Sequence, residues 1–421
     1  MKCVAVEASV SADRLWWNLP LCVGISSFSG ALAIVNPILM PYWRQHDMSM
    51  SDIWILQGVF AVVLALCQIP SGYWADSVSR KRALLVGTLL AAVGDLLYAQ
   101  ATTFFDFLFA EILLGIGLAC WAGADSAVIY DTLLYRGETS KNAYWSGLAT
   151  AGMFIITAFA ALASGYVFEL HNQLPFVISG GFSLLQLVFV SLIQEPSRDR
   201  SSQMLSIKEL PDVFVHCIND TLGVRWIMLA WCFLGTATQL AVWFYPVYFE
   251  ATGWNEKDQG KIFALYAITA GMSSACAGKF KGRSELLYPI FVGLAACAIS
   301  GHLLLGLVTT GWGVLFGVLH QICRGIVPVV FGTALHDRTP SSMRTTVLSI
   351  QGALATGAYG ICTMRLGWAA DSIGFQLVLI LVGMCLTAMA SVIWAKRPGD
   401  AEMCEQSYWE SRRATEATSA S

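Results

Sequence analysis

Long apolar stretches recur along almost the whole chain, separated by short segments that are rich in polar residues. A helix that crosses a membrane needs about 20 mostly apolar residues, because its backbone must satisfy its own hydrogen bonds in the hydrocarbon. Twelve stretches meet this length and are predicted to be transmembrane helices. They cover residues 18–42, 52–72, 83–101, 105–129, 143–168, 174–194, 225–249, 259–277, 285–308, 311–335, 345–366 and 375–395. The pattern predicts an all-α polytopic membrane protein with twelve spans.

One interval between the apolar stretches is longer and more polar than the others. Residues 195–224 read EPSRDRSSQMLSIKELPDVFVHCINDTLGV and contain acids, bases and two prolines. This composition is typical of a linker, and it divides the spans into two bundles of six. The predicted parts are an N-terminal segment, a first bundle, a central loop, a second bundle and a tail, at 1–17, 18–194, 195–224, 225–395 and 396–421.

The basic residues are distributed unequally between the two ends of the predicted helices. With both termini cytoplasmic, 20 of the 25 lysines and arginines lie on the cytoplasmic side, four lie outside and one lies within a span. Cytoplasmic loops of membrane proteins carry such an excess. The first apolar run is too long for the core of a signal peptide. The sequence therefore predicts cytoplasmic termini, and the absence of organelle signals favours a bacterial inner membrane.

Composition excludes several classes of protein. Charged residues make up 13% of the chain, whereas about 25% is usual for a soluble domain. A net charge of −3 offers no electrostatic attraction for nucleic acid. The 12 cysteines lie in apolar runs, the six histidines lack zinc spacing, and no glycine-rich phosphate loop is present. We expect no catalytic residue, metal, cofactor or nucleic-acid partner; the expected partners are a small-molecule substrate, protons and the lipid bilayer.

Corresponding residues recur in the two predicted bundles. Gly72 and Gly278 lie at the end of the second span of each half, 206 positions apart. Asp131 and Asp337 lie at the end of the fourth, at the same offset. Constant offsets indicate a duplicated unit. Two membrane repeats with a site between them near the midplane are a recurrent plan among transporters.

The segment that follows the second span reads GYWADSVSRKR. It resembles motif A of the major facilitator superfamily, a glycine followed four positions later by an aspartate and then by a basic cluster; here these are Gly72, Asp76 and Arg80 with Lys81. A glycine lets two helices approach closely, and an aspartate at a helix end accepts charge-assisted hydrogen bonds. Asp131, at the cytoplasmic end of the fourth span, is predicted to meet this loop and to form an ion-pair latch that holds one conformation.

The fourth span carries a second resemblance to the superfamily. The sequence EILLGIG, which starts at Glu111, is similar to motif B, an arginine followed by glycines four and six positions on. Glu111 stands at the arginine position, which reverses the charge. GADSAVIYD, which ends at Asp131, resembles the inner end of this helix in efflux-type members. The resemblance covers about residues 18–395 and implies a secondary active transporter of the efflux-permease type, with two pseudo-symmetric six-helix bundles that work by alternating access.

Charged residues within the spans are candidates for function. A charge deep in the hydrocarbon is costly and marks either a functional site or a buried ion pair. Glu111 and Asp125 are candidates for proton coupling. They are 14 residues apart, so a continuous helix places them on one face about 21 Å apart. Arg324, in the tenth span, is a candidate anchor for an anionic substrate or a partner for an intramembrane carboxylate.

Four uncharged side chains complete the candidate binding site. Asn36, which precedes a proline in the first span, and Gln239 in the seventh lie on helices that line the cavity in the superfamily. Trp243 and Tyr245 belong to an aromatic cluster near the outer end of the seventh span. Such clusters are typical of the membrane interface, and a substrate wall or an outer gate is the alternative.

The sequence predicts a transporter and favours export over import. Motif A with an efflux-like fourth span indicates proton-coupled export of a small organic molecule, such as a drug-like compound or a siderophore, by a monomer. Proton-symport import of a metabolite, an organic anion or a siderophore is the alternative. A passive facilitator would share the fold. A membrane receptor or an embedded enzyme is disfavoured, because the sequence has neither a large soluble domain nor clustered catalytic residues.

Overall fold

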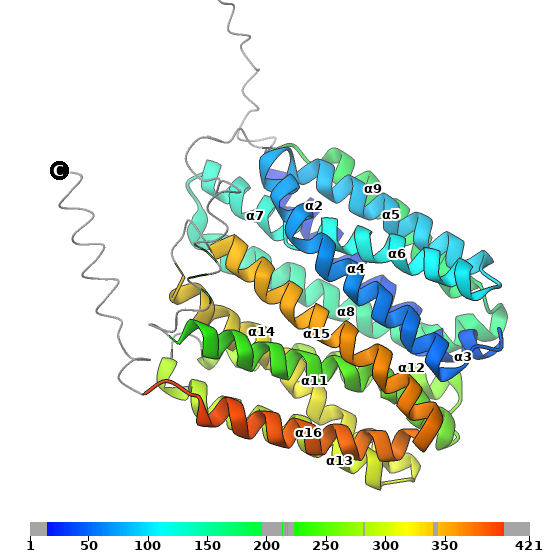
Figure 1. Ribbon diagram of the computed structural model, residues 1–421. Helices are drawn as coiled ribbons and strands as arrows, with labels where there is room; N and C mark the ends of the chain where they lie inside the picture. The colour runs from blue at the N-terminus through cyan, green and yellow to red at the C-terminus, as the bar shows by residue number, and fades with distance from the viewer. Residues whose placement is uncertain are drawn as a thin grey trace, which may run out of the picture.

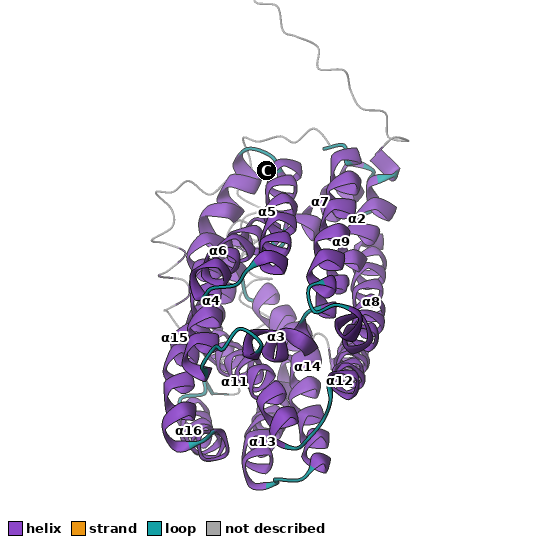
Figure 2. Ribbon diagram, turned by 90° about the vertical axis from the view of Figure 1, so that its right-hand side faces the viewer, coloured by secondary structure: helices purple, strands orange, loops and turns teal. Residues whose placement is uncertain are grey.

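The chain folds into long helices that lie side by side (Figure 1), joined by short loops (Figure 2). The computed structural model describes residues 15–195, 223–280, 283–339 and 344–399, together with 213, 215 and 217. No strand occurs among these residues. The α-helices are α2 (Asn18–Ser29), α3 (Leu39–Arg44), α4 (Met50–Ser77), α5 (Arg80–Gln100), α6 (Phe104–Trp121), α7 (Ala124–Tyr135), α8 (Asn142–Leu170), α9 (Leu174–Leu192), α11 (Val224–Ala251), α12 (Glu256–Ala277), α13 (Leu287–Leu307), α14 (Gly317–Asp337), α15 (Arg344–Ile373) and α16 (Phe375–Ala395).

Among the described residues, eleven segments are long and apolar enough to cross a membrane. They correspond to eleven of the predicted spans, with ends that differ by a few residues. The remaining span, predicted at 259–277, is α12, whose first six residues, EKDQGK, are strongly polar. α12 packs along α8 and α14, beside helices that meet the criteria for a span. The prediction of an all-α polytopic membrane protein is therefore confirmed. The predicted segments 1–17, 195–224 and 396–421 lie largely outside the described residues.

Two helices begin with capping boxes at the same end of the bundle. The Ser49 side chain accepts from the backbone of Asp52 at the start of α4, and the Asp52 carboxylate accepts from the Ser49 N–H at 3.0 Å. Thr103 and Asp106 form the same arrangement at the start of α6. A capping box satisfies two backbone donors that a helix start leaves without partners. These local contacts fix where both spans begin.

The first and fourth predicted spans are not continuous α-helices. After α2, the first span continues as two 3-10 segments, Gly30–Ile34 and Asn36–Ile38, before α3 begins. The fourth span divides into α6 and α7 around Gly123, whose φ is 78°. Glycine adopts this left-handed conformation at low cost, so it ends one helix and lets the chain change direction. Discontinuous helices of this kind surround the substrate sites of several transporter folds.

The helices form two groups that meet along two seams. Helices α2 to α9 pack on one another, as do α11 to α16, and the groups touch mainly where α4 lies along α15 and where α8 lies along α12. Glycines permit close approach at both seams. A Cβ at Gly58 would lie 3.1 Å from the carbonyl oxygen of Gly360, and a Cβ at Gly165 would lie 2.5 Å from the backbone nitrogen of Lys257. The two groups agree with the predicted architecture of two bundles.

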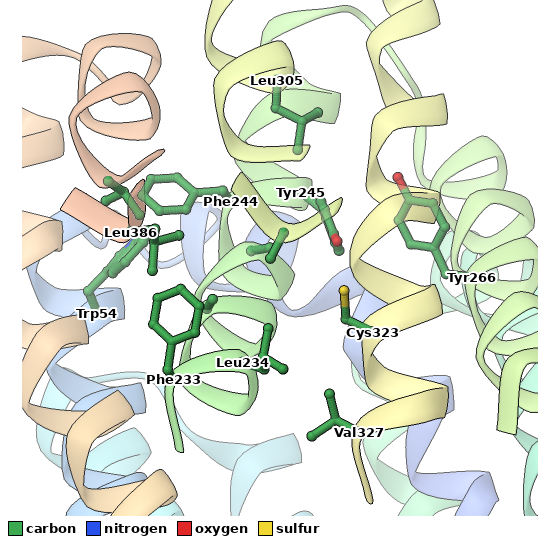
Figure 3. Packing of buried hydrophobic residues seen from close by; sticks show 14 of the residues in the cluster. Trp54, Phe233, Leu234, Phe244, Tyr245, Tyr266, Leu305, Cys323, Val327 and Leu386 are labelled. Carbon is green, nitrogen blue, oxygen red and sulfur yellow. The ribbon is translucent and has the colours of Figure 1, made fainter. Parts of the chain in front are cut away.

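The two ends of the bundle are named here by the central segment. At the linker end α9 stops and α11 begins, and at the opposite, far end α4 begins and α11 stops. One large cluster of buried apolar side chains extends through both helix groups. Figure 3 shows part of it, where Trp54 of α4 lies beside Phe244 of α11, with 4.6 Å between ring centroids. Other large apolar side chains are exposed, for example Phe105 at 76%, as a helix surface in contact with lipid requires.

Candidate functional site

A buried carboxylate in the first helix group forms the centre of a hydrogen-bonded cluster. Glu111 lies on α6 and is only 4% exposed. The Gln57 side-chain amide and the Tyr98 hydroxyl both donate to Glu111 Oε1, each at 2.7 Å. The Trp43 indole N–H donates to the Tyr98 hydroxyl at 3.0 Å. Among the described residues none donates a hydrogen bond to Glu111 Oε2. We call Glu111, Gln57, Tyr98 and Trp43 the Glu111 cluster.

The Glu111 cluster touches the second helix group through an aromatic contact. The ring of Trp43, in α3, lies 6.0 Å from the ring of Trp243, in α11, measured between centroids. Aromatic pairs at such distances contribute about 0.5–1.5 kcal/mol beyond their burial. The carboxylate is thus connected, through Tyr98 and Trp43, to a contact between the two groups. Only the fold brings these residues together, because they come from four separate helices.

The second acidic candidate, Asp125, belongs to a different cluster. The prediction that Glu111 and Asp125 share one face of one helix is wrong, because the backbone at Gly123 separates α6 from α7. Asp125 is half-buried in the first turn of α7, where the helix dipole favours negative charge. Ser26 of α2 donates to its Oδ2 at 2.7 Å. The two carboxylates therefore have separate partners.

Arg324 is exposed although it lies on a helix that three others surround. Its helix, α14, packs against α11, α12 and α13, and the adjacent Cys323 is fully buried. In the described part of the chain the guanidinium has no hydrogen bond or ion pair. Pro328, exposed one turn further on, lacks the N–H that would bond to the Arg324 carbonyl. A cation without a counter-charge and a released carbonyl thus lie close together at membrane depth.

The side chains of the uncharged candidates for substrate binding differ in their exposure. Asn36 is exposed at the start of the second 3-10 segment and Gln239 is half-buried on α11; neither side chain has a hydrogen-bond partner among the described residues. Trp243 is half-buried against Trp43. Tyr245 is fully buried, and its hydroxyl donates to the Gly317 carbonyl at 3.3 Å. In this conformation Tyr245 supports α14 and lines no open space.

The motif A loop forms a polar network at the linker end. Arg80 Nη1 lies 2.6 Å from Asp131 Oδ2, an ion pair that joins the start of α5 to α7. Gly72 lies on α4 at the α4–α15 seam, where an added Cβ would be 3.7 Å from Ser349 Oγ. The side chain of Asp76 lies outside the described part of the structure. A latch that involves Asp76 therefore stays a prediction.

Glu195, which no sequence pattern singles out, holds this loop in place. Its carboxylate accepts from the backbone N–H groups of Arg80 at 2.6 Å and Lys81 at 3.2 Å, and also from the Ser79 hydroxyl. These N–H groups are the first of α5, where the helix dipole attracts an anion. The Lys81 ammonium donates to the Ser191 carbonyl at 2.6 Å. The start of α5 is therefore anchored to the end of α9 as well as to α7.

Polar contacts join the two helix groups at the far end. The Ser51 N–H donates to Asp371 Oδ2 at 2.8 Å, which links α4 to α15. Lys257 Nζ lies 2.6 Å from Glu169 Oε2, which links α12 to α8, and a longer pair joins Arg44 to Glu250 at 3.9 Å. These contacts hold the two helix groups together at the far end.

The described residues contain no group of three or more His, Cys, Asp or Glu side chains that could hold a metal ion. His302 of α13 and His320 of α14 come closest to a ligand pair, because His320 Nε2 lies 2.9 Å from His302 Nδ1. Both rings are fully buried. Their facing nitrogens are occupied with each other and with the Ala298 carbonyl, so the pair serves packing between α13 and α14.

In comparisons with protein families and curated proteins, the chain is similar to known transporters. The family model described as Major Facilitator Superfamily matches residues 21–363. The uncharacterized MFS-type transporter YxaM of Bacillus subtilis is 23% identical over 266 residues, 61% of this chain and 64% of that protein. Multidrug resistance protein 1 of Bacillus subtilis is 23% identical over 41% of this chain and 43% of its own length. The quinolone resistance protein NorA of Staphylococcus aureus is 20% identical over similar shares. The chain spans less than two thirds of the length of these relatives.

Solved transporter structures share the fold. A bacterial homologue of the human lysosomal transporter Spinster, in an inward-facing and unoccupied conformation, has a TM-score of 0.71 at 16% identity, over 92% of this chain and 97% of that one. The nucleoside transporter NupG has a TM-score of 0.68 at 14% identity, over 91% and 98%. At this identity the likeness concerns the fold alone.

Proposed function

Because the chain belongs to the Major Facilitator Superfamily, and is thus a transporter of small molecules and not an enzyme, we propose that it exports a small organic molecule in exchange for protons. The helix groups 18–194 and 225–395 rock about the two seams, so that a central site opens first to one side of the membrane and then to the other. Export is favoured by the resemblance of the fourth span to efflux-type members. The names of the multidrug and quinolone resistance relatives point the same way.

The proposed orientation places the linker end and both termini in the cytoplasm of a bacterial cell, in the inner membrane. The positive-inside distribution of lysine and arginine supports this orientation. In it, the contacts between Ser51 and Asp371 and between Lys257 and Glu169 close the external side. The state described here is then the one that receives substrate from the cytoplasm. We propose that one chain, without a partner subunit, completes the cycle.

Glu111 is the proposed proton carrier. The proposal is supported by its connection to Trp243, which runs through hydrogen bonds to Tyr98 and Trp43 and then through a ring contact. A hydrogen bond to a carboxylate is about twice as strong as one between neutral groups. Protonation at Oε2 therefore weakens the bonds from Gln57 and Tyr98. Tyr98 then holds Trp43 less firmly, and the contact between Trp43 and Trp243 loosens at the far end. The protonation state of Glu111 thus affects a contact between the two helix groups at the far end.

Asp125 is proposed to be a second proton-binding residue on the path. It lies beyond the break at Gly123, closer to the linker end than Glu111, because α6 and α7 run in that direction. A proton that leaves Glu111 toward the cytoplasm therefore passes the Asp125 carboxylate. Asp131 and the motif A loop then mark the linker end of the same path, where Arg80 and Asp131 pair. We propose that this pair, with Asp76, holds one conformation and releases during switching.

Arg324 is the proposed substrate anchor, which favours substrates with an anionic group. An intramembrane arginine without a counter-charge is costly unless an anion or water compensates it. The exposed Asn36 and the half-buried Gln239 offer amide groups for the polar part of the same molecule. An acidic drug-like compound or a siderophore with carboxylate groups fits this combination. Trp243 offers an aromatic wall.

Flux into liposomes that contain the purified chain tests the function. With an imposed pH gradient and a panel of fluorescent acidic compounds, we expect counter-transport that collapses when a protonophore is added. The E111Q variant should lose gradient-driven accumulation and retain exchange of labelled for unlabelled substrate. Asp95 provides the matched control, since it is 3% exposed on the neighbouring helix and bonds to Ser179 away from Trp43; D95N should stay coupled.

Each other outcome replaces the proposal with a defined alternative. Accumulation in the direction of the proton flow identifies a symporter that imports its substrate. Equilibration without accumulation identifies a passive facilitator. Proton-coupled transport that E111Q leaves intact keeps the function and moves the coupling group elsewhere, with Asp125 the next to test. Transport of cationic compounds only would contradict the role of Arg324.

A further inference from the structure

A groove of about 1000 Å³ opens on the side of the second helix group. Residues of α11 form its floor, and residues of α15 and α16 form its walls. Figure 1 shows α11 between α15 and α16 on the face toward the viewer. Figure 2, which is turned by 90°, shows that α11 lies further into the molecule than α15 and α16. The groove is separate from the Glu111 cluster and from Arg324, because none of those residues lines it.

The groove is apolar along its length and basic at its linker end. Exposed apolar side chains such as Leu229, Leu381 and Met389 line it. Arg225, the second residue of α11, and Lys396, the first residue after α16, line it at the linker end. No aspartate or glutamate is among the described residues that line the groove, and Arg225 also interacts with another group. The groove therefore offers apolar surface for hydrocarbon chains and positive charge at one membrane surface.

The linker end of the groove has the features of a lipid headgroup site. Trp226 is buried beneath the groove there, and its indole N–H donates to the Ile393 carbonyl at 3.0 Å, which joins the floor to one wall. Basic pockets between membrane helices bind anionic lipid headgroups. The third cation of the groove, Arg365, lies 21 residues after the start of α15, about 30 Å along the helix. That distance is close to the whole hydrocarbon thickness, about 30 Å, so a lipid of the linker-side leaflet does not reach Arg365.

We propose that this groove binds one anionic phospholipid of the leaflet on the linker side. Its phosphate lies at Arg225 and Lys396, and its acyl chains lie on α11 between α15 and α16. A neutral phospholipid fills the apolar part equally well but gains nothing from the two cations. A lipid bound here fills the space between α16 and its neighbours and thereby stabilises the second helix group. The proposal is independent of the direction, coupling and substrate of transport.

Native mass spectrometry of the purified full chain tests the proposal. The detergent-solubilised protein is incubated with phosphatidylglycerol or with phosphatidylcholine of identical acyl chains, and the retained lipid is counted. We expect wild type to prefer phosphatidylglycerol, and K396Q to lose about fivefold of that preference, since a basic residue near an anionic surface contributes about 1 kcal/mol. R225Q should lose a similar factor. R365Q is the matched control, because it removes a positive charge from the same groove outside the reach of the headgroup.

Thermal stability in the same lipids gives a second measurement that does not depend on the mass spectrometer. Phosphatidylglycerol should raise the melting temperature of wild type and R365Q more than phosphatidylcholine does, and this difference should be smaller in K396Q. Lys396 is exposed and follows the end of α16, so K396Q leaves the fold intact even if R225Q does not. Equal retention of the two lipids by wild type overturns the proposal. So does an R365Q variant that loses the preference while K396Q keeps it, because the headgroup would then lie at the far end.

Discussion

Replacement of Gly165 by alanine should open the far end of the α8–α12 seam. The added Cβ would lie 2.5 Å from the Lys257 backbone nitrogen and would overlap the Glu256 carbonyl. Contacts between carbon and other heavy atoms are optimal at about 3.5–4.0 Å. The helices must therefore separate by about 1 Å or more. The atoms involved belong to the backbone, which cannot move aside as a side chain can. The contact between Lys257 and Glu169, at the same level, weakens with this separation.

The magnitude follows from the cost of overpacking, about 1–3 kcal/mol. If this cost falls on the closed state alone, the ratio of open to closed molecules rises by about 5- to 150-fold. Hydrogen–deuterium exchange measured on peptides from 160–175 and 252–262 reports this ratio, because amides at the seam exchange from the opened state. The matched control is G147A on the same helix, where an added Cβ meets no described atom within 4 Å. Unchanged exchange in G165A, with a folded protein, would refute closure through this seam.

Three further predictions concern stability and are measured by thermal unfolding in detergent. A double-mutant cycle of R80Q and D131N should give a coupling energy of about 1 kcal/mol, since both side chains are largely shielded from solvent; strictly additive losses would contradict a direct ion pair. G123A should cost about 1 kcal/mol, because alanine at a φ of 78° is strained, and a neutral result would mean that the helix break relaxes. K257Q should change stability by less than about 1 kcal/mol, because its ion pair with Glu169 is substantially exposed; a large loss would show that this contact dominates closure.

Hydropathy predicts the spans well and predicts their interruptions poorly. A window of apolar residues identifies 105–129 as one span, because the segment around Gly123 is apolar enough, but composition does not report a left-handed φ. The face shared by Glu111 and Asp125 was derived from an unbroken helix and fails for that reason. Gly123 itself was the available signal, since glycine is the residue that ends helices at positive φ.

The sequence indicates which charged residues are candidates for the site, but it does not indicate the residues that contact them in the folded chain. Glu111 and Arg324 stand out because charges within apolar runs are rare. Their environments differ in a way that no spacing reveals: Glu111 receives bonds from two other helices, and Arg324 has none in the described part of the chain. Glu195 gave no signal at all, because it lies next to a polar segment and meets the motif A loop only in the folded chain.

The unequal packing of the two seams determines the side on which the molecule can part. Helices α4 and α15 stay close along most of their length, since a Cβ would touch the opposite helix from Gly58 near the far end to Gly72 near the linker end. On the opposite seam the packing extends to Gly271 of α12, whose added Cβ would lie 3.3 Å from the Phe154 ring of α8, whereas Gly147 of α8 and Gly278, which follows α12, meet no described atom within 4 Å near the linker end. The α4–α15 seam therefore acts as a hinge, and the α8–α12 seam separates at the linker end. Large substrates should therefore enter and leave between α8 and α12. Bulky side chains introduced at this seam should reduce the transport of large substrates and leave the transport of small ones unchanged.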